Sequence, residues 1–208
     1  MDLALTLAPI LAVLVIGVIS PGPSFILVAR TAVAVSRQAA LSSALGMGTG
    51  AAVLALAALL GLNMLLQQIP GAYLALKVGG GLYLVWLAWK TWRGARLPIR
   101  LAEPDAGAPA GSLRHFAMAA GTMLSNPKAA VQYGVIFAAM LPRDPSATLM
   151  AVLPPSVFVL EFGWYALVAL ALSAPRPRAA YLQAKTGIDR IAGALLAALG
   201  IKLLLAWR

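Results

Sequence analysis

The chain has 208 residues, of which 62% are hydrophobic and only 11% are charged. A soluble domain carries roughly 25% charged residues, so this composition excludes an ordinary soluble fold and indicates an integral membrane protein. The absence of Cys excludes disulfides and thiolate chemistry, and a single His excludes a His-rich metal site. The formal charge of +10 lies mostly between apolar segments, which is typical of membrane topology signals and not of nucleic-acid binding.

Six apolar segments reach the roughly 20 residues that a membrane-spanning helix needs. They are about Leu3–Val35, Ala39–Leu66, Gly71–Trp92, Leu113–Met140, Ala147–Leu172 and Gly187–Trp207. Basic residues concentrate in the odd-numbered connections, which predicts that these face the cytoplasm and that both termini face the opposite side. A stretch with several prolines and charges at 94–112 separates residues 1–93 from residues 113–208 and is predicted to be a cytoplasmic linker.

Proline-containing breaks interrupt the first and the fourth segments. The first break consists of Ser20, Pro21, Gly22, Pro23 and Ser24, and the second of Ser125, Asn126, Pro127 and Lys128. Proline lacks a backbone N–H and disfavours a helical conformation of the preceding residue, so neither segment continues as one helix. Backbone groups freed at membrane depth need partners in protein or water, and transporters build substrate sites from such discontinuous helices. The simpler alternative is a pair of kinks that only shape helix packing.

The two halves also match in their third spans, which open with similar glycine-containing sequences and both end in Trp-Arg. Three spans per half is an odd number, so the second half is expected to be inverted relative to the first. The predicted fold is therefore all-α: a polytopic membrane protein with six transmembrane helices, arranged as two inverted three-helix repeats with broken first helices. Chance similarity between apolar segments is the alternative.

Glu161 lies near the middle of the fifth segment. A carboxylate at the bilayer centre costs roughly 2.5–3.5 kcal/mol, so its side chain should face the bundle interior or a wet cavity. There it could bind a substrate ammonium or carry a coupling proton. The structural alternative is a neutral carboxyl, or one paired with Lys77 or Lys128. Lys128 itself could attract a substrate carboxylate beside the second break, or extend along the helix to the headgroups.

Further candidates surround these residues. The half-helices that begin at Pro23-Ser24 and near Asn126-Pro127 are expected to offer unpaired N–H groups to a carboxylate. Gln132, Tyr133 and Tyr165 could complete a polar cluster, although such residues are also common in helix packing. The small-residue face of Gly46 and Gly50 permits close helix contact and leaves a homodimer open.

The ordered set of motifs resembles the LysE/RhtB amino-acid exporter family. Pro21-Gly22-Pro23, followed by Arg37 and the glycine run at 46–50, is similar to that family's opening motif, and Asn126-Pro127-Lys128-Ala129 is similar to its motif in the second half. Lys77, Gly80 and Tyr83 fit its third span. The resemblance covers essentially the whole chain. It implies an exporter of amino acids or close derivatives, driven by the proton motive force across the bacterial inner membrane.

The leading prediction is thus a secondary active transporter with Glu161 as the proton-coupling residue, amino acids and protons as partners, and no cofactor. An intramembrane enzyme is the first alternative, and it lacks the usual nucleophiles and metal ligands. A non-catalytic membrane subunit is the second, and it would not need broken helices or a central carboxylate.

Overall fold

The computed structural model describes residues 3–19, 22–68, 72–96, 111–142 and 145–205. Within these residues the chain forms eight α-helices and no strand. The helices are α1 (Leu3–Ile19), α2 (Pro23–Ala34), α3 (Arg37–Gln68), α4 (Ala72–Gly94), α5 (Ser112–Leu124), α6 (Pro127–Met140), α7 (Ala147–Leu172) and α8 (Pro175–Leu205). The six predicted segments correspond in order to α1 with α2, α3, α4, α5 with α6, α7, and α8. The all-α prediction is confirmed.

Two of the described helices are long and apolar enough to cross a membrane. They are α3 over Arg37–Leu62 and α7 over Ala147–Leu172, each 26 residues long. The pair of α1 and α2 qualifies jointly, with a bend of 61° at the break, which gives up to three spans. The six-span inverted repeat and the division of the chain at 94–112 stay predictions, and residues 97–110 of the linker lie outside the described part of the chain.

Both breaks restart the helix with a proline at or near its first position. Gly22 precedes Pro23 in an extended conformation, with φ −144° and ψ −169°. Asn126 precedes Pro127 with φ −82° and ψ 105°. The fixed φ of proline suits the first helical turn, where an N–H has no helical partner, while the residue before proline is held extended. The predicted interruptions of the first and fourth segments are confirmed.

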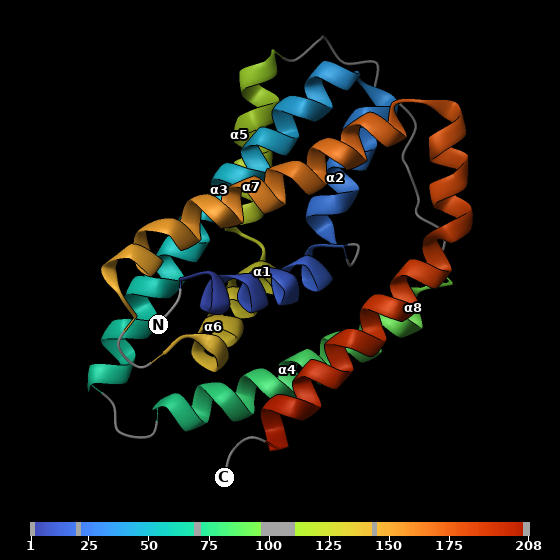
Figure 1. Ribbon diagram of the computed structural model, residues 1–208. Helices are drawn as coiled ribbons and strands as arrows, with labels where there is room; N and C mark the ends of the chain where they lie inside the picture. The colour runs from blue at the N-terminus through green and yellow to red at the C-terminus, as the bar shows by residue number, and fades with distance from the viewer. Residues whose placement is uncertain (1–2, 20–21, 69–71, 97–110, 143–144, 206–208) are drawn as a thin grey trace.

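The helices pack in two groups (Figure 1). The larger core joins α1, α2, α3, α5, α6 and α7 and includes the buried side chains of Phe25, Met47 and Leu153. α4 and α8 lie along each other and share a smaller core that includes Leu84 and, from α6, Val135. α1 and α6, the half-helices beside the breaks, contact helices of both groups. The breaks therefore lie where the two groups meet.

Close contact between α3 and α5 depends on glycine. A Cβ atom on Gly46 would overlap the carbonyl oxygen of Phe116, and a Cβ on Gly50 would lie 2.8 Å from the Cβ of Met123. The small-residue face thus packs helices within the chain, as its spacing predicts. The face that suggested a homodimer is covered by α5 of the same chain.

Candidate functional site

The two helix breaks contact each other through Asn126 and Ser24. Asn126 is buried, and its Nδ2 donates a hydrogen bond to Ser24 Oγ at 3.0 Å. Its Oδ1 accepts from the backbone N–H of Lys128, also at 3.0 Å, and so caps the first turn of α6. One side chain therefore satisfies its own helix end and joins it to a residue 102 positions away.

The ends of the half-helices differ in what they offer a ligand. In α6 the cap from Asn126 already satisfies one N–H that we expected to be unpaired. In α2 the corresponding position is Gly22, which supplies no side-chain cap. The first turn of α2 consequently remains suited to a negatively charged group, since a helix N-terminus carries partial positive charge.

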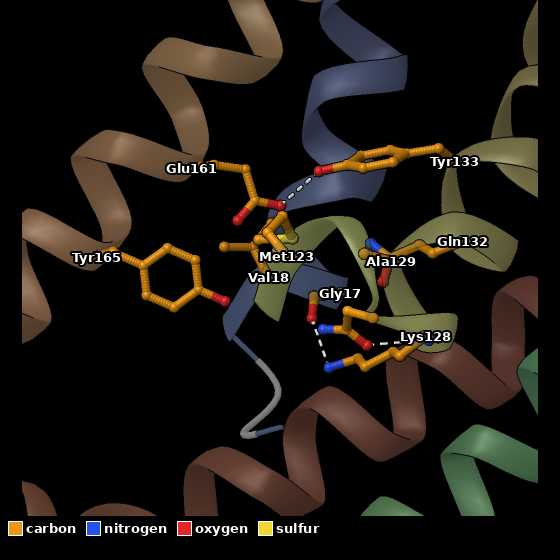
Figure 2. A pocket seen from close by; sticks show the side chains of 10 residues that line it. Gly17, Val18, Met123, Lys128, Ala129, Gln132, Tyr133, Glu161 and Tyr165 are labelled. Atoms are coloured by element: carbon orange, nitrogen blue, oxygen red, sulfur yellow. Dashed lines mark hydrogen bonds between the residues drawn. The ribbon is translucent and has the colours of Figure 1, made fainter. Parts of the chain in front are cut away.

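Lys128 is directed at the end of α1 instead of the headgroups. Its Nζ donates a hydrogen bond of 3.0 Å to the carbonyl oxygen of Gly17. Gly17 lies in the last turn of α1, where carbonyls lack helical partners and the dipole is negative. Figure 2 shows the Lys128 side chain extended towards Gly17. The structure therefore does not show the alternative in which Lys128 reaches along its helix to the headgroups.

Glu161 is only 4% exposed and projects from the middle of α7. The hydroxyl of Tyr133 donates a hydrogen bond to its Oε1 at 2.7 Å. Its Oε2 has no hydrogen-bond partner within the part of the chain that the structure describes. Tyr165 points towards the same space from α7 and is hydrogen bonded to Ser24 through its side chain. One carboxylate oxygen is thus held in place, and the other is available to a cation.

A small cavity, partly open to the outside, lies between these groups, and its enclosed space has room for little more than a water molecule. Its lining residues come from α1, α5, α6 and α7 and are Gly17, Val18, Met123, Asn126, Lys128, Ala129, Gln132, Tyr133, Glu161 and Tyr165. Ligand pockets usually enclose about 300–1,000 Å³, so in this conformation the pocket is too small to enclose an amino acid. Lys128 and Glu161 both line it, which gives the cavity one basic and one acidic side chain.

Half of the predicted site residues meet at this cavity. Six of them line it: Asn126, Lys128, Gln132, Tyr133, Glu161 and Tyr165. Ser24 lies behind the lining and contacts it through Asn126. Gly22, Pro23 and Pro127 shape the backbone at the breaks and are not among the lining residues. Ser20 and Pro21 lie outside the described residues.

Sequence reasoning missed some residues around the site. Gly17 leaves room for the side-chain amide of Gln132, which a Cβ there would displace; a glycine within a turn of a proline break was the signal. A buried ion pair on α8 was also missed, with Lys185 Nζ 2.6 Å from Asp189 Oδ2. Lys185 is one of the basic residues between the fifth and sixth apolar segments, a connection that the charge pattern places on the cytoplasmic side. Among the described residues, no group of three His, Cys, Asp or Glu side chains could hold a metal ion.

Apolar helices with two breaks that meet beside a buried lysine and a buried glutamate are typical of a membrane transporter. Comparison with known proteins agrees, since the profile of the family described as LysE type translocator matches residues 15–206. The chain belongs to this family and is a membrane translocator, not an enzyme.

Three relatives are similar to this protein over nearly its whole length. The threonine efflux protein of Escherichia coli K12 is 34% identical over 196 residues, which cover 92% of this chain and 94% of the relative. The threonine efflux protein of Salmonella typhi is 33% identical over the same shares. The uncharacterized membrane protein YahN of Escherichia coli K12 is 26% identical over 191 residues, covering 91% of this chain and 85% of the relative. No solved structure matches.

Proposed function

We propose that the protein exports small neutral amino acids, threonine among them, across the bacterial inner membrane. The observation that carries this proposal is the meeting of the two helix breaks at a cavity lined by Lys128 and Glu161. A zwitterionic amino acid has an ammonium and a carboxylate on neighbouring carbon atoms. The free Oε2 of Glu161 suits the ammonium, and Lys128 with the uncapped first turn of α2 suits the carboxylate.

Charge balance favours a neutral substrate. Lys128 and Glu161 together carry no net charge, so a zwitterion enters the cavity without leaving an unpaired charge behind. A cationic amino acid would add one positive charge to a buried site, where an uncompensated ion costs several kcal/mol. We therefore expect threonine and serine to be exported and lysine to be excluded.

The hydrogen-bonding groups around the cavity favour a hydroxylated side chain. Tyr133, Tyr165 and Gln132 supply hydrogen-bonding groups from α6 and α7. A site that hydrogen bonds a substrate hydroxyl discriminates against analogues that lack it, because its own polar groups are then left unpaired. The names of the threonine efflux relatives agree with this expectation.

We propose that Glu161 also carries the proton that drives export. Of the residues that the structure describes, it is the one carboxyl group that lines the cavity, and it can bind either a proton or a substrate ammonium at Oε2. Binding one excludes the other, which is the requirement for exchanging a cytoplasmic amino acid against an external proton. Alternating access of the cavity, by movement of the two helix groups around it, would complete the cycle.

The experiment is counterflow and proton-driven transport of radiolabelled amino acids in proteoliposomes. The wild-type protein should transport L-threonine in response to an imposed pH gradient and leave L-lysine untransported. Glu161→Gln should lower threonine transport about tenfold or more, since a hydrogen bond to a charged group contributes about 1.5–3 kcal/mol. Glu103→Gln, in the predicted linker, is the matched control and should transport within about twofold of wild type.

Two results would contradict the proposal. Failure of the wild-type protein to exchange any amino acid would remove the export function. Threonine transport by Glu161→Gln with an unchanged rate and unchanged response to the pH gradient would remove Glu161 from the mechanism.

A further inference from the structure

Aromatic and basic side chains gather at one end of the α4–α8 pair, away from the cavity. The two helices lie side by side (Figure 1) and run antiparallel: a Cβ on Gly193 would lie 3.1 Å from the carbonyl oxygen of Ala88, and one on Gly200 would lie 2.9 Å from that of Gly81. The last turns of α4 therefore lie beside the part of α8 that precedes Gly193. We define the basic–aromatic cluster as the three exposed tryptophans and the three cations at this end: Trp86, Trp89, Trp92, Lys90, Arg93 and Arg190.

Two of the cations come from α4 itself and lie over rings of the same helix. Lys90 Nζ is 5.0 Å from the centre of the Trp86 ring, and Arg93 Cζ is 5.3 Å from the centre of the Trp89 ring. A cation over the face of an indole ring is attracted by its negative π-face. The rings therefore restrict where these two flexible side chains can place their charge.

The third cation, Arg190, comes from α8. Its Cζ lies 5.9 Å from the centre of the Trp92 ring. Trp92 follows Trp89 by one helical turn, so guanidinium groups from two different helices lie over neighbouring rings. The Nε of Arg190 is buried and has no hydrogen-bond partner within the described ranges. A buried N–H without an acceptor is rare in proteins, which points to an acceptor that is not part of this chain.

The described residues provide no exposed carboxylate that could neutralise the cluster. The two acidic residues among them are Glu161 and Asp189, and both are buried. Asp189 pairs with Lys185 through Oδ2, and its Oδ1 accepts no hydrogen bond from the neighbouring Arg190. The excess positive charge at this end of α4 and α8 therefore suits an external anion.

The surface beside the cluster indicates what kind of anion it is. Exposed apolar side chains continue along both helices, with Leu82 on α4 and Ile191 and Leu195 on α8. A soluble phosphate would contact the cations and leave these side chains without a partner. A phospholipid carries its phosphate directly above its acyl chains, so it matches both parts of the surface.

We propose that the basic–aromatic cluster binds the headgroup of an anionic phospholipid such as phosphatidylglycerol. Arg93 and Arg190 donate hydrogen bonds to the phosphate oxygens, for which the planar fork of a guanidinium is well suited. The acyl chains lie along the apolar side chains of α4 and α8. Basic sites between membrane helices bind anionic headgroups in this way. The lipid would hold the end of α8 against α4, and its binding does not depend on the export function.

The competing explanation is that these cations only set the orientation of the helices in the membrane, for which any positive charge is sufficient. The two explanations are separated by titrating phosphatidylglycerol, and phosphatidylcholine as the lipid without net charge, into the purified full-length protein in detergent. Binding is measured by native mass spectrometry, and thermal unfolding with each lipid is the second readout. The wild-type protein should bind phosphatidylglycerol about tenfold more tightly than phosphatidylcholine and unfold at a higher temperature with it.

Four variants test the residues. Arg190→Gln should lower the affinity for phosphatidylglycerol about tenfold, because it removes a charged hydrogen-bond donor. Arg190→Lys keeps the charge but not the fork or the stacking, and should still lower the affinity about threefold or more. Arg93→Gln, at an exposed position, should lower the affinity about as much as Arg190→Gln, and it tests the site even if the Arg190 variants do not fold. Lys202→Gln, at the other end of α8, is the matched control for loss of one positive charge and should bind within about twofold of wild type.

Three outcomes would overturn the inference. The first is equal affinity of the wild-type protein for the two lipids. The second is wild-type affinity for phosphatidylglycerol in Arg190→Lys, which would leave only a requirement for charge. The third is stabilisation by inorganic phosphate equal to that by phosphatidylglycerol, which would replace the lipid with a soluble anion.

Discussion

The contact between the two breaks can be tested by a double-mutant cycle at Ser24 and Asn126. Asn126→Ala removes an N-cap, which contributes about 0.5–2 kcal/mol, and a buried hydrogen bond, which contributes about 0.5–1.5 kcal/mol. We therefore expect a loss of about 1–3.5 kcal/mol in the free energy of unfolding. Ser24→Ala removes the shared hydrogen bond but not the cap, so the coupling energy between the two positions should be about 0.5–1.5 kcal/mol.

The measurement is unfolding of the purified protein in mixed micelles with increasing SDS. Ser43→Ala is the matched control, because Ser43 is also buried but its hydroxyl bonds only the carbonyl oxygen of Ala39 in its own helix. It should show no coupling to Asn126→Ala. Additive losses for Ser24→Ala and Asn126→Ala, indistinguishable from this control, would refute the view that the breaks support each other.

Three other predictions concern the tyrosines, the glycines and the topology. Tyr133→Phe should lower the free energy of unfolding by about 1.5–3 kcal/mol, because it leaves both oxygens of Glu161 unpartnered. Tyr165→Phe should lower it by only about 0.5–1.5 kcal/mol. Equal losses for the two variants would contradict the geometry. Gly46→Val should destabilise by at least about 1–3 kcal/mol through overpacking, and Gly61→Val, where no atom lies within 4 Å of a Cβ, should be nearly neutral. Because the chain has no Cys, the labelling of single introduced cysteines reports the membrane topology. A cysteine in the linker between the halves, which is predicted to be cytoplasmic, should not react with a membrane-impermeant maleimide in intact cells. One in the uncharged connection between the second and third segments should react, and the reverse pattern would invert the predicted orientation.

The features that sequence reasoning found are those that local chemistry determines. A break follows from Gly22-Pro23 and from Asn126-Pro127, where an extended residue precedes proline. Proline alone is not sufficient, since α7 continues through Pro154-Pro155 without interruption. The interior placement of Glu161 could be predicted because the cost of exposing a carboxylate to lipid does not depend on the details of packing.

The features that sequence reasoning missed depend on how the helices pack. Nothing local shows that Asn126 reaches Ser24, because this requires a particular rotation of α6 against α2. The burial of Lys185 and Asp189 likewise depends on where α8 meets the end of α4. Their spacing of four residues on a helix was a usable signal for an ion pair, but only the fold distinguishes a buried pair from a solvated one.

The last prediction concerns the contact between the two helix groups at Gly80 of α4, which packs against Val135 of α6. A Cβ there would overlap the side chain of Val135, which lies on α6 three residues from Gln132 in the cavity wall. Gly80→Ala should therefore displace α6 and lower both stability and threonine transport, at a cost of about 1–3 kcal/mol in unfolding. Val135→Ala alone leaves a cavity and should cost somewhat less than the about 2–5 kcal/mol seen for larger truncations. Combined in one chain, the two substitutions should recover most of the loss, because the methyl groups that a Cβ on Gly80 would meet are then absent. Additive losses in unfolding and in transport would show that α6 does not depend on this contact for its position.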